Sequence, residues 1–122
     1  PEHDIRVVHA GIDPAVPWEE QDPRNLLNIR VLRPEGGEPV LWSERYFGPT
    51  HVVFGHHAMA GLQLHPFSTG LDTGCVYGNR LSALVLAEGE RVLASSEERR
   101  MKQLCSVPAK RIYFDPGGPR AA

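Results

Sequence analysis

The sequence lacks the features that mark several specialised classes of protein. Only two of its 122 residues are cysteines, and Cys75 and Cys105 are too far apart for a C-x-x-C motif. No apolar run reaches the ~18 residues that cross a bilayer. The formal net charge is −2, so a basic surface for duplex nucleic acid is not expected. These absences exclude a disulfide framework, a membrane span and bulk electrostatic binding of DNA.

The composition is that of an ordinary soluble globular protein, with 41% hydrophobic and 23% charged residues. The length suits one small domain or part of a larger one. The opening "PEHDIRVVHAG" lacks an initiator Met and a leader pattern. We therefore expect the chain to come from the middle of a longer polypeptide. The two cysteines are interpreted as free thiols in a reducing cytoplasm, with a single disulfide as the alternative.

Short β-branched runs and frequent turn residues predict a strand-dominated domain. Strands are expected at 5–8, 51–54 and 103–107, a last short one at 111–114, and a hairpin of 81–87 with 91–95. Helical segments are expected at 23–31, capped by Asp22, at one turn within 42–47, and after the capping-box pair Ser95 and Glu98. Loops or turns are expected at 33–39 and after an extended piece at 62–64, and a flexible tail at 115–122.

Two histidines share one local setting. His9 ends the apolar run "IRVV", and His56 follows "VVF" through Gly55. A strand that stops at the rim of a sheet presents its last side chains to the crevice where α/β proteins bind ligands. Imidazoles held there are suitable ligands for zinc, manganese or iron. A histidine at a strand end is more often a solvated residue, and local geometry alone leaves both interpretations open.

Three motifs in order carry a resemblance to a known family. "VVHAGIDPAVPWEEQDPRNLLNIR", "VVFGHHAMAGL" and "GLDTGCVYGNRLSALVL" follow one another as in the calcineurin-like metallophosphoesterases. The chain resembles the branch that holds the symmetrical diadenosine tetraphosphatases and the phosphoprotein phosphatases. The family's earlier Asp-x-His, Gly-Asp-x-x-Asp-Arg-Gly and Gly-Asn-His-Glu motifs are absent. The resemblance therefore implies an α/β (α+β) fold, namely the C-terminal half of a β-sandwich flanked by helices, over residues 1–108, with a terminal strand and tail at 109–122.

The resemblance also implies roles for individual residues. His9 and His56 match two ligands of the same metal, and His57 has no ligand counterpart. Arg30 resembles the arginine that contacts substrate phosphate, which suits its permanent charge and paired donors. An exposed helix arginine is the alternative, and Arg33 and Arg45 are further candidates.

The segment 70–78 resembles the loop that lines the active site of the family. Its candidate residues are Asp72, Thr73, Gly74 and Tyr77, although a packed tyrosine is the alternative for Tyr77. Cys75 is not interpreted as a nucleophile, because four residues rather than five separate it from Arg80 and no activating base is visible.

The implied reaction is hydrolysis of a phosphoric ester or anhydride at two divalent metal ions (Mn, Zn or Fe), which activate a bridging water. No catalytic acid or base is expected in this half, because those groups belong to the N-terminal half of the same domain, the expected partner. The expected substrate is a dinucleoside tetraphosphate or another phosphorylated small molecule. A serine/threonine phosphoprotein is the alternative, and a non-catalytic pseudo-phosphatase or regulatory piece is a third possibility.

Overall fold

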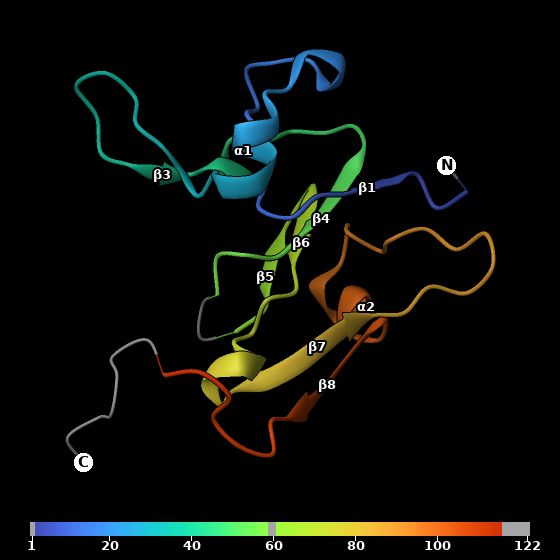
Figure 1. Ribbon diagram of the computed structural model, residues 1–122. Helices are drawn as coiled ribbons and strands as arrows, with labels where there is room; N and C mark the ends of the chain where they lie inside the picture. Colours follow the sequence, from blue (N-terminus) through green and yellow to red (C-terminus); the bar gives the residue numbers. More distant parts are fainter. Residues whose placement is uncertain (1, 59–60, 116–122) are drawn as a thin grey trace.

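The structure is a computed structural model that describes residues 2–58 and 61–115. Its centre is a four-stranded mixed sheet with the order β1-β4-β6-β5 (Figure 1). The strands are β1 (Ile5–Val7), β4 (His51–Phe54), β5 (Gln63–His65) and β6 (Ser68–Gly70). β1, β4 and β6 run parallel, whereas β5 is antiparallel to β6. The carboxyl ends of β1 and β4 therefore meet at one edge of the sheet.

The long crossover from β1 to β4 covers one face of this sheet. It contains the helix α1 (Pro23–Asn28), the hairpin of β2 (Val31–Leu32) with β3 (Val40–Leu41), and the 3-10 helices η1 (Trp18–Glu20) and η2 (Trp42–Glu44). Trp42 and Phe54 meet edge to face, with ring centroids 4.9 Å apart. The buried cluster around them consists of Ile12, Trp42, Tyr46, Val52 and Phe54. This cluster is the main apolar core of the described chain.

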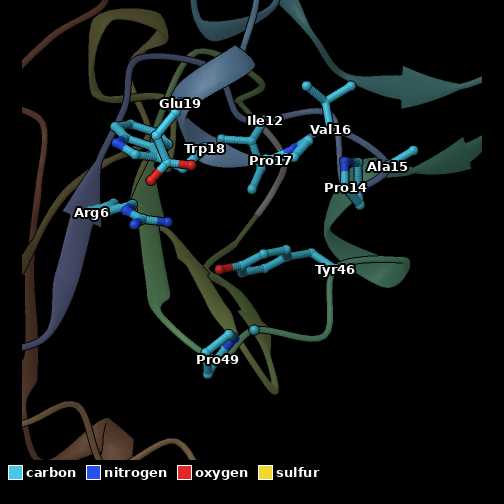
Figure 2. A pocket seen from close by; sticks show the side chains of 11 residues that line it. Arg6, Ile12, Pro14, Ala15, Val16, Pro17, Trp18, Glu19, Tyr46 and Pro49 are labelled. Carbon is cyan, nitrogen blue, oxygen red and sulfur yellow. The ribbon is translucent and has the colours of Figure 1, made fainter.

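Two residues of this core, Ile12 and Tyr46, also border an open space. Tyr46 lines a pocket of about 410 Å³ together with the loop 12–19 and Arg6 of β1 (Figure 2). Loop residues Pro14 and Pro17 fix the backbone next to this space. The loop is therefore held in place by its own prolines and by the core beneath it.

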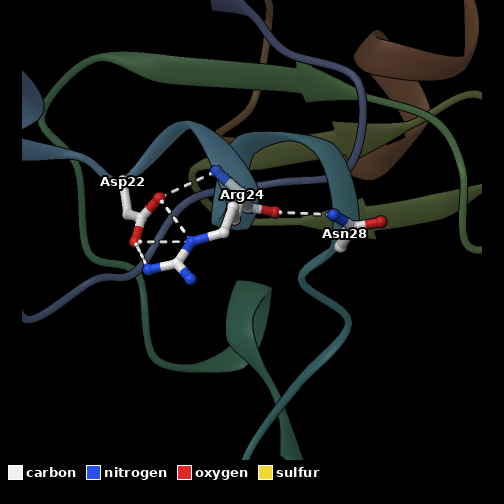
Figure 3. A network of polar contacts seen from close by, with 3 residues as sticks. All are labelled: Asp22, Arg24 and Asn28. Carbon is white, nitrogen blue, oxygen red and sulfur yellow. Dashed lines mark hydrogen bonds and ion pairs between the residues drawn. The ribbon is translucent and has the colours of Figure 1, made fainter.

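The helix α1 begins as its sequence predicts. The Asp22 side chain accepts a hydrogen bond from the backbone N–H of Arg24, with Pro23 at the first helical position (Figure 3). Arg24 also donates a side-chain hydrogen bond to Asp22, and this bond lowers the pKa of the carboxyl group. The helix ends at Asn28, earlier than expected, because residues 31–32 leave it to form β2.

The remaining strands form a second, smaller unit. β7 (Arg80–Leu84) pairs with β8 (Leu104–Pro108), and α2 (Glu97–Met101) precedes β8. A third 3-10 helix, η3 (Cys75–Tyr77), joins the central sheet to this unit. Arg100 of α2 is buried and donates to the carbonyl oxygens of Ser68 and Ala94, so it ties the second unit to the central sheet. None of the helices in the described residues has the length and apolar character to cross a membrane.

The expected hairpin of 81–87 with 91–95 is wrong. The partner of β7 is β8, and residues 91–95 form no strand. Gln103 explains the difference, because its side-chain amide binds the N–H of Leu93 and the carbonyl oxygen of Arg91. One buried side chain thus satisfies the backbone that a strand partner would have paired.

Three smaller expectations are also corrected. Residues 68–70 are a strand inside the sheet rather than turns. Residues 111–114 form no strand, since the N–H groups of Tyr113 and Phe114 both donate to the carbonyl oxygen of Val76. The cap of α2 is Ser96, which bonds the N–H of Arg99 one register later than the Ser95–Glu98 pair. The other strand expectations and the turn within 42–47 are confirmed, and the tail after residue 115 lies outside the described residues.

The buried His51 makes the fold sensitive to acid. Burial, followed by the nearby Arg100 charge, lowers the pKa of His51 from 6.5 to about 4. The unfolded chain therefore binds more protons between these values, so stability falls as the pH decreases from about 6.5 to 4, by about 3 kcal/mol at most. Urea unfolding at pH 7 and pH 4.5 should show this loss, and His51→Gln should remove much of it. An unchanged pH dependence in the variant would contradict the assignment.

Candidate functional site

The two strand-end histidines meet in the folded chain. His9 follows β1 and His56 follows β4, and these strands are adjacent and parallel. The backbone joins them directly, because the N–H of Gly55 donates to the carbonyl oxygen of His9 at 2.8 Å. Nε2 of His9 lies 3.1 Å from Nδ1 of His56, and the ring centroids are 4.8 Å apart. Two histidines that are 47 positions apart in the sequence thus bring one ring nitrogen each to the same place.

The backbone at His56 has an unusual conformation. Its φ is +68°, in the left-handed region that non-glycine residues seldom adopt. The N–H of His57 donates to the carbonyl oxygen of Gly55 at 2.7 Å, which closes a tight three-residue turn centred on His56. Such a conformation costs about 1 kcal/mol or more and is typical of functional sites. The turn directs the His56 ring to the cavity beside His9.

That turn separates the two histidines of the doublet. His9 and His56 line a cavity of about 350 Å³, and His57 is not among its lining residues. The carbonyl oxygen of His57 instead accepts a hydrogen bond from the Gln63 side chain. The doublet therefore has one member at the cavity and one outside it.

The electrostatic surroundings favour neutral imidazoles in the doublet. Partial burial lowers the pKa of His56, with further lowering by the charges of Arg30, His9 and His57, whereas Asp72 acts in the opposite sense. Burial and then Arg30 also lower the pKa of His57. A neutral imidazole has a nitrogen lone pair available to bind a metal ion.

The expected loop contributes some of its residues to this cavity. Asp72 and Thr73 line it, whereas Gly74 and Tyr77 do not. Gly74 has a left-handed backbone with a φ of +76° and lies in a turn. Its N–H donates a hydrogen bond to Oδ1 of Asp72. The Tyr77 ring is exposed, and its centroid lies 6.2 Å from that of the exposed Phe114 ring.

Arg30 lies close to the histidines without lining the cavity. Its charge lowers the pKa of both His56 and His57, and its side chain is exposed. Within residues 2–58 and 61–115 it forms no ion pair. Arg33 and Arg45 line a different pocket of about 490 Å³ beside the β2–β3 hairpin.

Arg80 and Ser82 were not singled out from the sequence, but both line the histidine cavity. Nε and Nη2 of Arg80 donate to the hydroxyl and carbonyl oxygens of Ser106. The Ser82 hydroxyl lies 2.7 Å from that of Thr73. Leu81 between them lines the cavity as well, so strand alternation alone could not have found them.

The two imidazoles fit part of a metal site. Metal–nitrogen bonds of about 2.0–2.1 Å at ordinary angles place adjacent ligand nitrogens roughly 3.0–3.4 Å apart. The observed 3.1 Å lies in this range. No cluster of three or more histidine, cysteine or acidic residues suited to a metal ion occurs in the described part of the chain. This chain can thus supply two ligands of such a site, and further ligands would have to come from elsewhere.

Comparisons with known proteins find similarity to one group of enzymes. No family model matches the chain. Symmetrical bis(5'-nucleosyl)-tetraphosphatases of Burkholderia mallei, Burkholderia pseudomallei and Burkholderia thailandensis are 60% identical over 37 residues, which is 30% of this chain and 13% of theirs. A crystal structure of a protein provisionally assigned as a diadenosine tetraphosphatase matches with a TM-score of 0.65 and 34% identity, over 88% of this chain and 47% of that chain.

The α/β fold and the resemblance to calcineurin-like phosphoesterases are therefore confirmed. Within that superfamily, the similarity is to the branch of the symmetrical diadenosine tetraphosphatases. The matched regions cover about half of the solved structure and about an eighth of the curated relatives.

Proposed function

We propose that this chain is part of a metal-dependent hydrolase that cleaves a phosphoric anhydride, with a dinucleoside tetraphosphate as substrate. The observation that supports this most strongly is the convergence of His9 and His56, 3.1 Å apart, at the edge of a phosphoesterase-like sheet. The similar proteins are named for symmetrical cleavage of bis(5'-nucleosyl) tetraphosphates. Symmetrical cleavage breaks the central anhydride bond and releases two nucleoside diphosphates.

In this proposal, His9 and His56 hold one of two divalent ions (Mn, Zn or Fe) through neutral imidazole nitrogens. Such ions, when bound, neutralise charge on phosphate oxygens and supply an activated water. The His56 turn fixes the direction of its ring before any ligand arrives. The left-handed backbone at His56 thus holds its imidazole in position to bind the metal ion.

Arg30 would hold the phosphate chain beside the histidine pair. It is exposed, close to His56 and without an ion-pair partner in the described chain, so its guanidinium is available for phosphate oxygens. Asp72 and Thr73 line the cavity and offer polar groups to the same ligand. The remaining metal ligands and the acid that assists the leaving group would come from an N-terminal segment, the expected partner. The free thiols of Cys75 and Cys105 suit a cytoplasmic location.

The test compares the 122-residue chain alone with a protein that also carries the N-terminal segment. With Mn²⁺, the longer protein should convert diadenosine tetraphosphate to two molecules of ADP, which anion-exchange chromatography would detect. The chain alone should not do so, nor should it hydrolyse a generic aryl phosphate, because it lacks the other ligands. Turnover by the isolated chain would disprove the proposal that it supplies only part of the metal site. A preference of the longer protein for phosphopeptides would favour a protein phosphatase.

A further inference from the structure

A second pocket lies on the side of the central sheet that the long crossover covers. We define the Trp18 pocket by Arg6, Pro17, Trp18, Glu19, Tyr46 and Pro49, which line it with parts of the loop 12–16. Figure 2 shows Arg6 directly below Trp18, with Tyr46 extending across the lower side of the same space. Its volume of about 410 Å³ falls in the range of small-molecule sites. Flat rings and prolines make up much of its wall.

Arg6 offers a flat cationic surface in this pocket. Its guanidinium carbon lies 4.6 Å from the Trp18 ring centroid, so the two groups stack. Arg6 forms no ion pair within the part of the chain that the structure describes. Unstacked nucleobases bind to aromatic rings and to guanidinium planes in this manner.

Glu19 adds an acceptor at the edge of the pocket. Its side chain is exposed, and like Arg6 it has no ion-pair partner among residues 2–58 and 61–115. A carboxylate accepts N–H groups from the edge of a base, such as an exocyclic amine. A pocket that binds phosphate would instead carry an excess of positive charge. One cation, one anion and several rings therefore fit a base better than a phosphate.

The Trp18 pocket and the histidine cavity share no lining residue, but one stretch of chain contributes to both. Arg6 lies three residues before His9 on the same strand segment, and the loop that carries Trp18 begins directly after His9. We propose that the Trp18 pocket binds a nucleobase of the substrate, a purine with an exocyclic amine such as adenine, while the phosphates lie towards His9 and His56. This inference rests on the proposed function, because it assumes a nucleotide substrate.

Binding without turnover tests the pocket directly. The longer protein is titrated with AMP and, separately, with ribose 5-phosphate, which has the same phosphate but no base. Trp18 fluorescence should respond to AMP, since the other tryptophan, Trp42, is buried in the core. Loss of one base stack corresponds to roughly a 5- to 150-fold weaker affinity. We expect this difference between the two ligands, and again between the native protein and Trp18→Leu followed by calorimetry.

Neighbouring acidic residues provide a matched control. Glu19→Gln should weaken AMP binding several-fold, and Glu20→Gln, next to it but not in the pocket lining, should not. If Trp18→Leu proves unstable in a thermal melt, Arg6→Met removes the guanidinium plane and keeps an apolar stem. Equal affinities for AMP and ribose 5-phosphate, or unchanged AMP affinity in Glu19→Gln and in the stacking variant, would overturn the pocket assignment.

The two proposals fail in different ways. If the longer protein hydrolyses diadenosine tetraphosphate while these variants bind AMP normally, only the Trp18 pocket is wrong. If AMP binding depends on Trp18 and Glu19 but no phosphoanhydride is cleaved, the nucleobase site remains and the hydrolase assignment is wrong.

Discussion

His56→Ala is expected to remove one metal ion from the longer protein and nearly abolish its hydrolysis of diadenosine tetraphosphate. The imidazole is one of two that converge on the proposed ion, and nothing else in the described chain replaces it. The loss should exceed the ~10- to 100-fold that removal of a mere hydrogen-bond partner of a metal ligand costs. Elemental analysis and steady-state kinetics measure the two effects, and His9→Ala should reproduce both.

The neighbouring histidine is the matched control. His57→Ala should keep the full metal content, because His57 does not line the cavity. His56→Gly separates ligand loss from backbone strain, since glycine adopts the left-handed conformation of residue 56 without cost. We expect His56→Gly to lose metal like His56→Ala while being more stable to urea by about 1 kcal/mol. Loss of metal in His57→Ala would refute the assignment within the doublet.

Gly11→Ala is expected to destabilise the protein by about 3 kcal/mol, the upper part of the range for overpacked cores. A methyl group at Gly11 would lie 2.2 Å from Nε1 and 2.3 Å from Cε2 of Trp42, far inside contact distance. Trp42 is 2% exposed and central to the core, so it has little room to move. Urea unfolding monitored by circular dichroism gives the free energy of unfolding.

Gly61→Ala serves as the control, because no atom of residues 2–58 and 61–115 lies within 4 Å of the added methyl group and the φ of Gly61 is not left-handed. It should change stability by only a few tenths of a kcal/mol. Comparable stability of Gly11→Ala and the native protein would mean that Trp42 does not pack against this glycine. The result also bears on the site, since Gly11 lies two residues after His9 and sets the path of the chain there.

The candidate site was predictable where its chemistry depends on short patterns. His9 and His56 each end an apolar run, so two strand ends that carry histidines were predictable from the sequence. Their convergence on one metal was only implied by the family resemblance, and the parallel pairing of β1 with β4 is what brings them together. The Asp22–Pro23 start of α1 was equally local, since a cap needs only the residues next to it. The comparisons confirmed the family resemblance that these motifs carried.

Long-range packing decided what local patterns could not. Residues 91–95 follow β7 in the sequence and contain a short apolar run that could have formed a strand. β7 nevertheless pairs with β8, because the side chain of Gln103 binds the backbone of Arg91 and Leu93. Ser68 and Gly70 have weak strand signals, but β4 and β5 pair with them on both sides. Pairing energy from two neighbours outweighs a poor intrinsic preference.

The sequence by itself determined the strand ends, the helix cap and the two imidazoles, because each depends on a few adjacent residues. Only the tertiary structure decided how the turn at His56 directs its ring towards His9, that Arg80 lines the cavity, and that Arg6 lies over the Trp18 ring. These arrangements depend on turns and on contacts between distant segments. Such contacts contribute to stability only once the segments have packed together.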